Sequence, residues 1–152
     1  ILVLSGVFSE DDRHYPAGWY LRNPPGSSHA PSSHEGADIF VKLWQMQPGE
    51  QRNVRINTHD PAAWQRRDGR EVCPLFSDAF ERLAPLEALL TDSADGIELL
   101  VLTGEVITDG QSCERGSWVR LPVGERPEIT AGTHGATVYL KTGHLAAAVQ
   151  GV

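Results

Sequence analysis

The chain carries one sequence pattern twice, and this repeat limits the folds that it can adopt. Residues 1–46 and 99–145 share glycine, proline and basic residues, and Gly104 follows Gly6 by 98 positions. The residues that keep this offset are Gly6, Gly18, Arg22, Pro24 and Gly26, matched by Gly104, Gly116, Arg120, Pro122 and Gly124. After one inserted residue, a second group follows: Gly36, Ala37 and Lys42, matched by Gly135, Ala136 and Lys141. Because internal repeats fix an architecture, the sequence predicts a tandem of two related units.

Both copies have the composition of short β-strands separated by turns. Residues 1–8 are rich in β-branched and apolar residues, and the Pro-Pro-Gly run at 24–26 ends the strand before it. Residues 78–90 have the best helical pattern, but Pro85 interrupts it, so two short strands are expected there. The predicted strands are 1–8, 18–23, 28–32, 37–46, 53–57, 71–76, 80–84, 86–91, 97–107, 117–121, 126–130 and 136–142. This pattern predicts an all-β sandwich or barrel.

The two copies differ in what precedes them. Residues 53–98 supply the front of the second unit, whereas the first copy opens at Ile1 in the middle of an apolar strand pattern. We therefore expect the first unit to lack its front half. The predicted domains are 1–52, the C-terminal half of the first unit with a linker from residue 47, and 53–152, the second unit.

Composition excludes several classes of function. A net charge of −7 argues against binding to a phosphate backbone, which needs clustered Lys and Arg. No apolar run approaches the roughly 18 residues that cross a bilayer. Cys73 and Cys113 are too few for a disulfide scaffold. We expect a cytoplasmic protein that binds neither nucleic acid nor membrane.

One motif carries a family resemblance. The spacing of Gly18, Pro24, Gly26 and His29 resembles the second motif of the cupin superfamily, although Ser33 stands where the family has Asn. The segments YPAGWYLRNPPGSSHAP and EGADIFVKLWQM resemble bicupins related to the cupin part of the anti-sigma factor ChrR. The resemblance implies tandem RmlC-like jelly-roll β-barrels, the first of them incomplete.

The resemblance also implies a metal site. In cupins, two His and one Glu of the first motif join the second-motif His around one divalent ion, here Zn, Fe, Mn or Ni. His29 matches the second-motif ligand, and the other ligands would lie upstream of Ile1. In the second unit the ligand positions are lost, because they hold Thr91, Ser93, Ile97 and Pro127. We expect a metal in the first unit of the intact protein and none in the second.

Two aromatic residues precede the motif histidine. Trp19 and Tyr20 could line the mouth of a ligand cavity, and packing in the core is the alternative for both. Without the motif, a single His such as His29 is more often a structural or surface residue than a ligand.

Three functions fit this resemblance. The first is a regulatory or sensor module that binds a metal or small molecule, with a sigma factor as partner through a domain outside this chain. The second is a metal-dependent dioxygenase or isomerase, in which the metal acts as a Lewis acid. The third is a non-catalytic binding or oligomerisation barrel. We favour the non-enzymatic regulator, and a homodimer is expected because an open barrel exposes strand edges.

Overall fold

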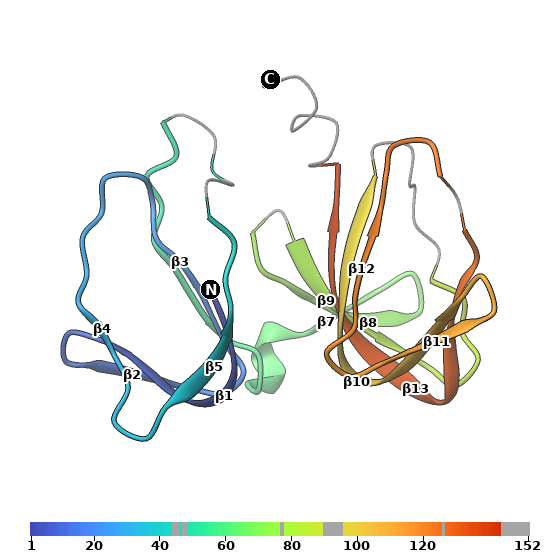
Figure 1. Cartoon of the computed structure of the whole chain (residues 1–152), viewed down its shortest axis with the longest axis horizontal. Coiled ribbons are helices and arrows are strands. Elements are labelled where there is room, and N and C mark those ends of the chain that lie inside the picture. Colours follow the sequence, from blue (N-terminus) through green and yellow to red (C-terminus); the bar gives the residue numbers. More distant parts are fainter. Residues whose placement is uncertain (44–45, 47–48, 77, 90–95, 126, 144–152) are drawn as a thin grey trace. The chain divides into compact units, whose positions relative to one another are not determined.

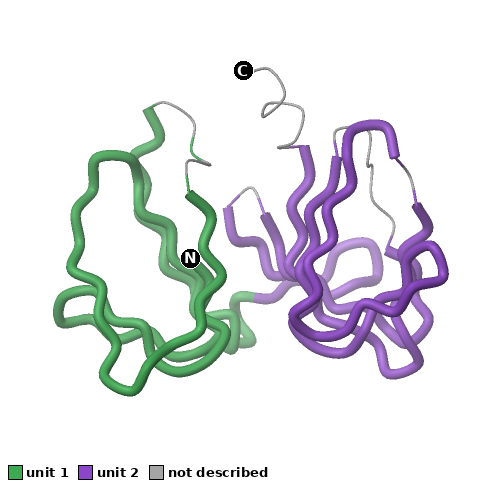
Figure 2. Tube along the Cα trace, viewed as in Figure 1, with its two compact units in different colours: residues 1–63 green, residues 64–152 purple. Residues whose placement is uncertain are grey.

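The computed structural model describes residues 1–43, 46, 49–76, 78–89, 96–125 and 127–143. The chain divides into two compact units, Ile1–Ala63 and Trp64–Val152 (Figure 2). The described residues form strands and turns, with one short 3-10 helix, η1 (Pro61–Ala63). The predicted all-β class is confirmed. No helix in the described part of the chain is long and apolar enough to span a bilayer.

The sheet of unit 1 is built around one central strand (Figure 1). Its strands are β1 (Leu2–Glu10), β2 (Arg13–Pro16), β3 (Trp19–Arg22), β4 (Pro31–Ser32), β5 (Ala37–Phe40) and β6 (Val54–Asn57). Strand β1 pairs with β2, β3, β4 and β5, and β6 pairs with β3. All of these pairings are antiparallel, and β1 and β2 form a hairpin with a short turn between Glu10 and Arg13.

The sheet of unit 2 repeats this arrangement and extends it (Figure 1). Its strands are β7 (Gln65–Arg67), β8 (Arg70–Pro74), β9 (Asp78–Leu83), β10 (Ile97–Thr108), β11 (Gln111–Glu114), β12 (Trp118–Leu121) and β13 (Ile129–Thr142). The central strand β10 pairs with β11, β12 and β13. Beyond β13 lie β9, β8 and β7 in that order.

The strand registers show that the sequence repeat is also a structural repeat. Leu2 lies opposite Tyr20 in unit 1, and Leu100 lies opposite Trp118 in unit 2, each 98 positions later. The central strand of each unit also carries an irregularity at the same place, between Val3 and Ser5 and between Val101 and Thr103. The tandem organisation predicted from the sequence therefore holds at the level of individual residue pairs.

Close approach of two strands explains the first repeated glycine. Gly6 has a φ of +68° and Gly104 a φ of +71°. A Cβ at Gly6 would collide with the carbonyl oxygen of Gly36, and one at Gly104 with that of Gly135. Only glycine tolerates both the positive φ and the neighbouring backbone. Backbone geometry therefore requires glycine at positions 6 and 104 in both copies of the repeat.

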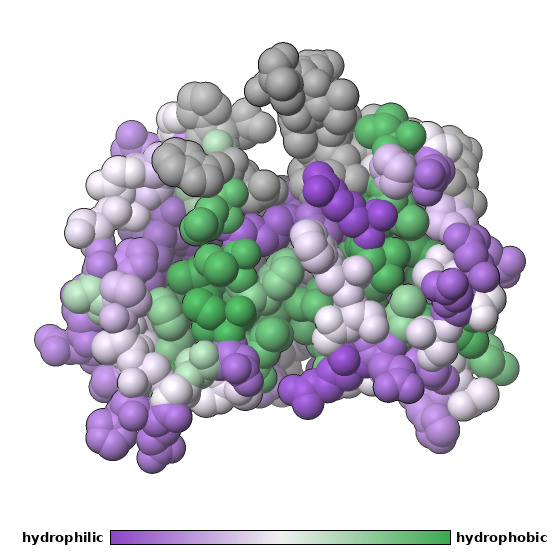
Figure 3. Space-filling view, viewed as in Figure 1, coloured by the Kyte–Doolittle hydropathy of each residue, from purple (hydrophilic) through white to green (hydrophobic). Residues whose placement is uncertain are grey.

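The two units bury different amounts of apolar side chain. The core of unit 2 consists of Leu83, Leu89, Ile97, Leu99, Val101, Val106, Leu121, Ile129, Ala131, Ala136, Val138 and Leu140. The core of unit 1 consists of Val3, Phe8, Tyr15 and Leu21. We call the sheet face that carries each core the inner face of that unit. In unit 1, Ile39, Val41 and Leu43 stay exposed, and Figure 3 shows apolar residues gathered on this unit's surface.

Several predicted elements differ in extent from the observed ones. The predicted strands 126–130 and 136–142 form a single strand, β13, and the predicted strand 28–32 is reduced to β4. Strand β5 ends at Phe40 rather than at Met46, and the predicted strand 86–91 is reduced to a bridge between Ala88 and Thr130 within the residues described. Residues 58–70, where no strand is predicted, contain β7, which pairs with β8 through a turn at Asp68 and Gly69. Both turn residues have positive φ, the geometry that an Asp-Gly pair provides in tight hairpins.

The observed division of the chain falls later than the predicted one. Sequence reasoning placed the boundary after residue 52, whereas the compact units meet after Ala63. Pairing explains this position, because β6 hydrogen-bonds along β3 and so lies in unit 1.

Candidate functional site

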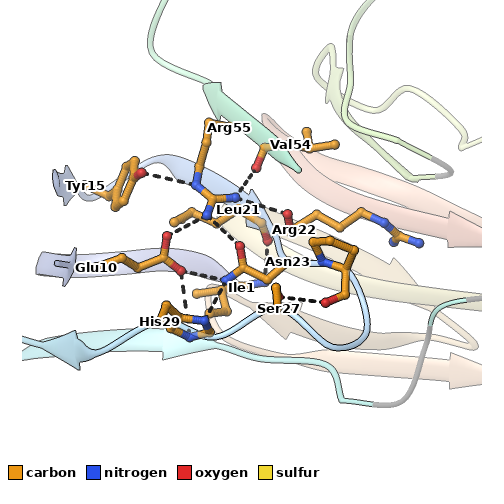
Figure 4. Close-up of polar contacts among 11 residues, drawn as sticks. Ile1, Glu10, Tyr15, Leu21, Arg22, Asn23, Ser27, His29, Val54 and Arg55 are labelled. Carbon is orange, nitrogen blue, oxygen red and sulfur yellow. Dashed lines mark hydrogen bonds and ion pairs between the residues drawn. The ribbon is translucent and has the colours of Figure 1, made fainter. Parts of the chain in front are cut away.

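Four polar side chains meet on the inner face of unit 1 (Figure 4). Glu10 ends β1 two residues after Phe8, so strand alternation places it on the same face as that core residue. Asn23 follows Leu21 in the same way, and Arg55 on β6 lies directly opposite Leu21. With His29, which precedes β4, these residues form what we call the Arg55 cluster: Glu10, Asn23, His29 and Arg55.

Arg55 is the centre of this cluster. A guanidinium has five N–H donors, and Arg55 uses all five. Its acceptors are the Tyr15 hydroxyl at 3.1 Å, the Arg22 carbonyl at 3.1 Å, the Val54 carbonyl at 2.7 Å, Glu10 Oε2 at 2.6 Å and Asn23 Oδ1 at 2.5 Å. Since no donor is left over, Arg55 holds the cluster together and has no capacity for an additional anion.

The other three members contact one another. Asn23 Nδ2 donates to Glu10 Oε1 at 2.6 Å and lies 3.4 Å from His29 Nδ1. His29 Nε2 lies 3.8 Å from Glu10 Oε1. The Glu10 side chain is 5% exposed and that of His29 is 30% exposed. Solvent therefore reaches the cluster mainly at His29, while the carboxylate is enclosed and paired with Arg55.

Unit 2 has no charged side chain at the four positions equivalent to Glu10, Tyr15, Asn23 and His29. The residues 98 positions after Glu10, Tyr15, Asn23 and His29 are Thr108, Cys113, Leu121 and Pro127. Leu121 belongs to the hydrophobic core. The Thr108 hydroxyl oxygen is buried and has no hydrogen-bond partner among the described residues. The polar cluster is therefore a property of unit 1 and is not required by the shared β framework.

The two predicted cavity residues lie on opposite faces of β3. Trp19 is on the inner face, where its ring meets that of Tyr15 edge-on at a centroid distance of 5.3 Å. Tyr20 points to the other face, opposite Leu2, and is 6% exposed. The structure brings neither into a hydrogen bond with His29 among the contacts that it describes.

The four lost ligand positions of unit 2 are only partly described. Ile97 is 1% exposed in the hydrophobic core, and Pro127 is half-buried in the segment before β13. Thr91 and Ser93 lie outside the described residues. The neighbouring Glu98 points to the face opposite Ile97, where its carboxylate accepts a hydrogen bond from Trp118 Nε1 at 3.0 Å.

The residues that the structure describes do not form a metal site by themselves. They contain no group of three His, Cys, Asp or Glu side chains placed to hold an ion. In the Arg55 cluster, His29 meets one carboxylate, and both oxygens of Glu10 already accept hydrogen bonds from Asn23 and Arg55. A divalent ion at His29 would need ligands beyond this set.

Unit 2 has a guanidinium cluster of its own, centred on Arg70. Arg70 donates to Glu81 at 2.8 Å, to Glu87 at 2.9 and 2.7 Å, and to the Ala88 carbonyl at 2.9 Å. Burial acts to raise the pKa of Glu87, but the backbone N–H of Ala84 and the Arg70 guanidinium outweigh it and lower that pKa. We call Arg70, Glu81 and Glu87 the Arg70 cluster.

The buried thiol of unit 2 is not set up for chemistry. Cys73 is fully buried, and burial raises the pKa of its thiol, with Arg82 acting weakly in the opposite direction. Nucleophilic cysteines have lowered pKa values, so Cys73 stays a protonated core side chain.

Sequence reasoning found His29 but missed Glu10, Asn23 and Arg55. A signal for the first two was present in the repeat, because Glu10 and Asn23 are polar where unit 2 has Thr108 and Leu121. Arg55 lies after the repeated segment, so no comparison between the copies could have identified it.

The fold and the Arg55 cluster define a tandem β protein in which one unit has a polar inner face. Residues 1–47 match the family described as "ChrR Cupin-like domain". The predicted resemblance of this segment to the ChrR-type cupins is therefore confirmed. The match covers β1 to β5 and ends before β6, the strand that carries Arg55. No curated protein matches the chain.

Three solved structures are similar to parts of this chain at low sequence identity. Drosophila melanogaster CENP-C bound to CAL1 is 17% identical, with 51% of this chain and 78% of that chain covered and a TM-score of 0.42. Rhodobacter sphaeroides SigE in complex with the anti-sigma ChrR is 17% identical, with 51% and 46% covered and a TM-score of 0.42. A cupin 2 conserved barrel domain protein from Salinispora arenicola is 16% identical, with 60% and 91% covered and a TM-score of 0.42.

Proposed function

We propose that this chain is a ChrR-like regulatory module whose binding function resides in unit 1, and that unit 2 supports it without a site of its own. The observation that carries the proposal is the contrast at equivalent inner-face positions. Unit 1 places Glu10, Asn23 and His29 there, and unit 2 places Thr108, Leu121 and Pro127. Polar groups are costly on an enclosed face unless they are paired, so a paired polar cluster with one exposed histidine favours recognition over packing.

The ligand is proposed to be a divalent metal or a small molecule that contacts His29. The His29 side chain is 30% exposed, more than those of Arg55 and Glu10 at 21% and 5%, and His29 matches the second-motif histidine of the cupins. For a metal, the remaining ligands would come from outside the residues described. The match to the ChrR family also motivates a sigma factor as partner, contacted through a domain outside this chain. The two free cysteines motivate a cytoplasmic location. The exposed apolar residues of β5 and its neighbourhood motivate a homodimer.

The proposal is tested by comparing metal binding by wild type, by a variant without His29 and by a control variant without a histidine of unit 2. Full-length wild type, His29→Ala and His134→Ala proteins are loaded separately with Zn²⁺, Fe²⁺, Mn²⁺ and Ni²⁺, and the metal retained after gel filtration is measured by elemental analysis. His134 is an exposed histidine of unit 2, so its variant controls for adventitious binding. We expect His29→Ala to lose the metal that wild type and His134→Ala retain. Equal metal content in all three proteins would refute a metal-binding role for His29.

A further inference from the structure

Hydrogen-bond donors and acceptors in the Arg55 cluster determine how Asn23 is oriented. Arg55 Nη2 can only donate, so the Asn23 atom 2.5 Å away must be the amide oxygen. The amide nitrogen then faces Glu10 Oε1 at 2.6 Å, where a carboxylate can only accept. The two contacts agree, and reversing the amide would place donor against donor and acceptor against acceptor.

The orientation of Asn23 in turn determines which nitrogen of His29 carries the proton. Asn23 Nδ2 lies 3.4 Å from His29 Nδ1, and an amide nitrogen only donates. His29 Nδ1 must therefore present its lone pair. The proton of the neutral ring is then on Nε2, which lies 3.8 Å from Glu10 Oε1. Both ring nitrogens thus face the group that complements them.

We propose that Arg55 and Asn23 are positioning residues that hold neutral His29 in the Nε2–H tautomer, with Nδ1 facing Asn23 and Nε2–H facing Glu10. Arg55 acts through Asn23, since it does not touch the imidazole itself. Because the five donors of Arg55 are all used, its role is to fix the amide and the carboxylate. The inference rests on the site of the proposed function and constrains it: in this tautomer the one lone pair of the ring is on Nδ1, so a metal that binds His29 must replace the contact with Asn23.

A substitution at Asn23 tests whether the orientation of this amide determines the tautomer of His29. Nuclear magnetic resonance of ¹⁵N-labelled full-length protein distinguishes the tautomers, because a protonated and an unprotonated ring nitrogen have well-separated ¹⁵N shifts. The spectra are recorded at a pH at which the imidazoles are neutral. We expect wild-type His29 to be in the Nε2–H form. In Asn23→Asp the side chain can only accept, so His29 should change predominantly to the Nδ1–H form.

Substitutions at Arg55 and, as a control, at Arg70 test whether Arg55 fixes the orientation of the Asn23 amide. Lysine at 55 keeps the charge but has no planar fork of donors, so Asn23 can reverse, and His29 should become a mixture of tautomers in Arg55→Lys. Arg70→Lys makes the same change in unit 2 and should leave the His29 shifts as in wild type. His134 provides an internal reference that no variant should alter.

Three results would overturn the inference. The first is a wild-type protein in which His29 carries its proton on Nδ1; this measurement does not depend on whether any variant folds. The second is an unchanged His29 tautomer in Asn23→Asp. The third is an equal change in Arg55→Lys and Arg70→Lys, which would indicate general destabilisation. None of these measurements involves a bound metal, so a negative result in the binding test leaves them intact.

Discussion

The two units share a strand arrangement, but equivalent apolar side chains are buried in unit 2 and exposed in unit 1. Val138 and Leu140 on β13 are 0% and 6% exposed, whereas the equivalent Ile39 and Val41 in unit 1 are 38% and 44% exposed. In unit 2, β13 is paired on one side with β10 and on the other with β9. In unit 1, the described pairing of β5 is with β1 alone.

Different residues therefore specify the strand arrangement and the interior of each unit. The repeated glycines and the matching registers specify the central hairpins, and they do so equally in both units. The interior depends instead on which strands pack across the inner face and on whether residues such as Glu10 and Asn23 are polar. A β framework of this kind can therefore keep its geometry while a site is gained or lost.

Removing a framework glycine should produce the largest effect, and the same effect in both units. Gly6→Ala and Gly104→Ala place a Cβ against a backbone carbonyl at positive φ, which we expect to cost about 3 kcal/mol or more of unfolding free energy. Chemical denaturation of the full chain measures this loss.

The chain provides a matched control for each glycine. Gly26 and Gly124 also have positive φ, at +79° and +88°, but a Cβ there would meet nothing within 4 Å. Alanine at these positions should cost about 1 kcal/mol, the conformational part alone. An equal loss at Gly6 and Gly26 would mean that close strand approach does not fix the repeat.

The second largest effect is expected at the Arg55 cluster and in unit 1 only. Arg55→Leu leaves the enclosed Glu10 carboxylate without its cation, which should destabilise unit 1 by about 3 kcal/mol. Glu10→Thr installs the residue that unit 2 has, and the double variant should recover most of the loss. The measurement is a double-mutant cycle from denaturation curves.

An exposed ion pair provides the comparison for that cycle. Arg82 and Glu71 form a pair at 2.9 Å with side chains 46% and 55% exposed. Glu71→Gln should cost less than about 1 kcal/mol, as exposed pairs usually do. If Glu10 and Arg55 show no more coupling than this pair, the Arg55 cluster is not an enclosed charge network.

The fold was more predictable from sequence than the site, for physical reasons. Glycine and proline positions report local backbone geometry, so the repeat predicted the class and most strands. The Arg55 cluster joins residues from four separate segments, and Arg55 reaches Glu10 across 45 positions of sequence. Such a contact depends on strand pairing between β3 and β6, which no local pattern encodes. The Asp68-Gly69 pair indicates a turn by its local sequence, but the pairing of β7 with β8 on either side of it was not predicted.

Hydrogen exchange should distinguish the two edge environments directly. In β13 both sides of Ala136–Lys141 are paired, so its amides are protected from either direction. In β5 the amides that point away from β1 should exchange faster by about an order of magnitude or more, because they open without breaking a second ladder. Exchange measured by mass spectrometry on the full chain checks this. Equal protection would show that the outer edge of β5 is covered in solution.

The smallest expected effect is an acid-dependent loss of stability at the Arg70 cluster. The pKa of Glu87 is lowered on folding from its ordinary value of 4.5, because the Ala84 N–H and Arg70 outweigh the opposing effect of burial. A carboxyl with a lowered folded-state pKa binds protons more readily when unfolded, so its stabilisation is present above the unfolded value. It is lost as pH falls below 4.5 and through the folded-state pKa.

The expected size of this loss is less than about 1 kcal/mol, since the Glu87 side chain is 31% exposed and solvent screens the pair. Denaturation midpoints measured across the acid range should therefore fall slightly more steeply in wild type than in Glu87→Gln, which cannot titrate there. Arg70→Leu should reduce the slope in the same way, because it removes a cause of the lowered pKa. If Glu87→Gln and wild type lose stability in parallel, the acid dependence arises elsewhere in the chain and the Arg70 cluster contributes packing only.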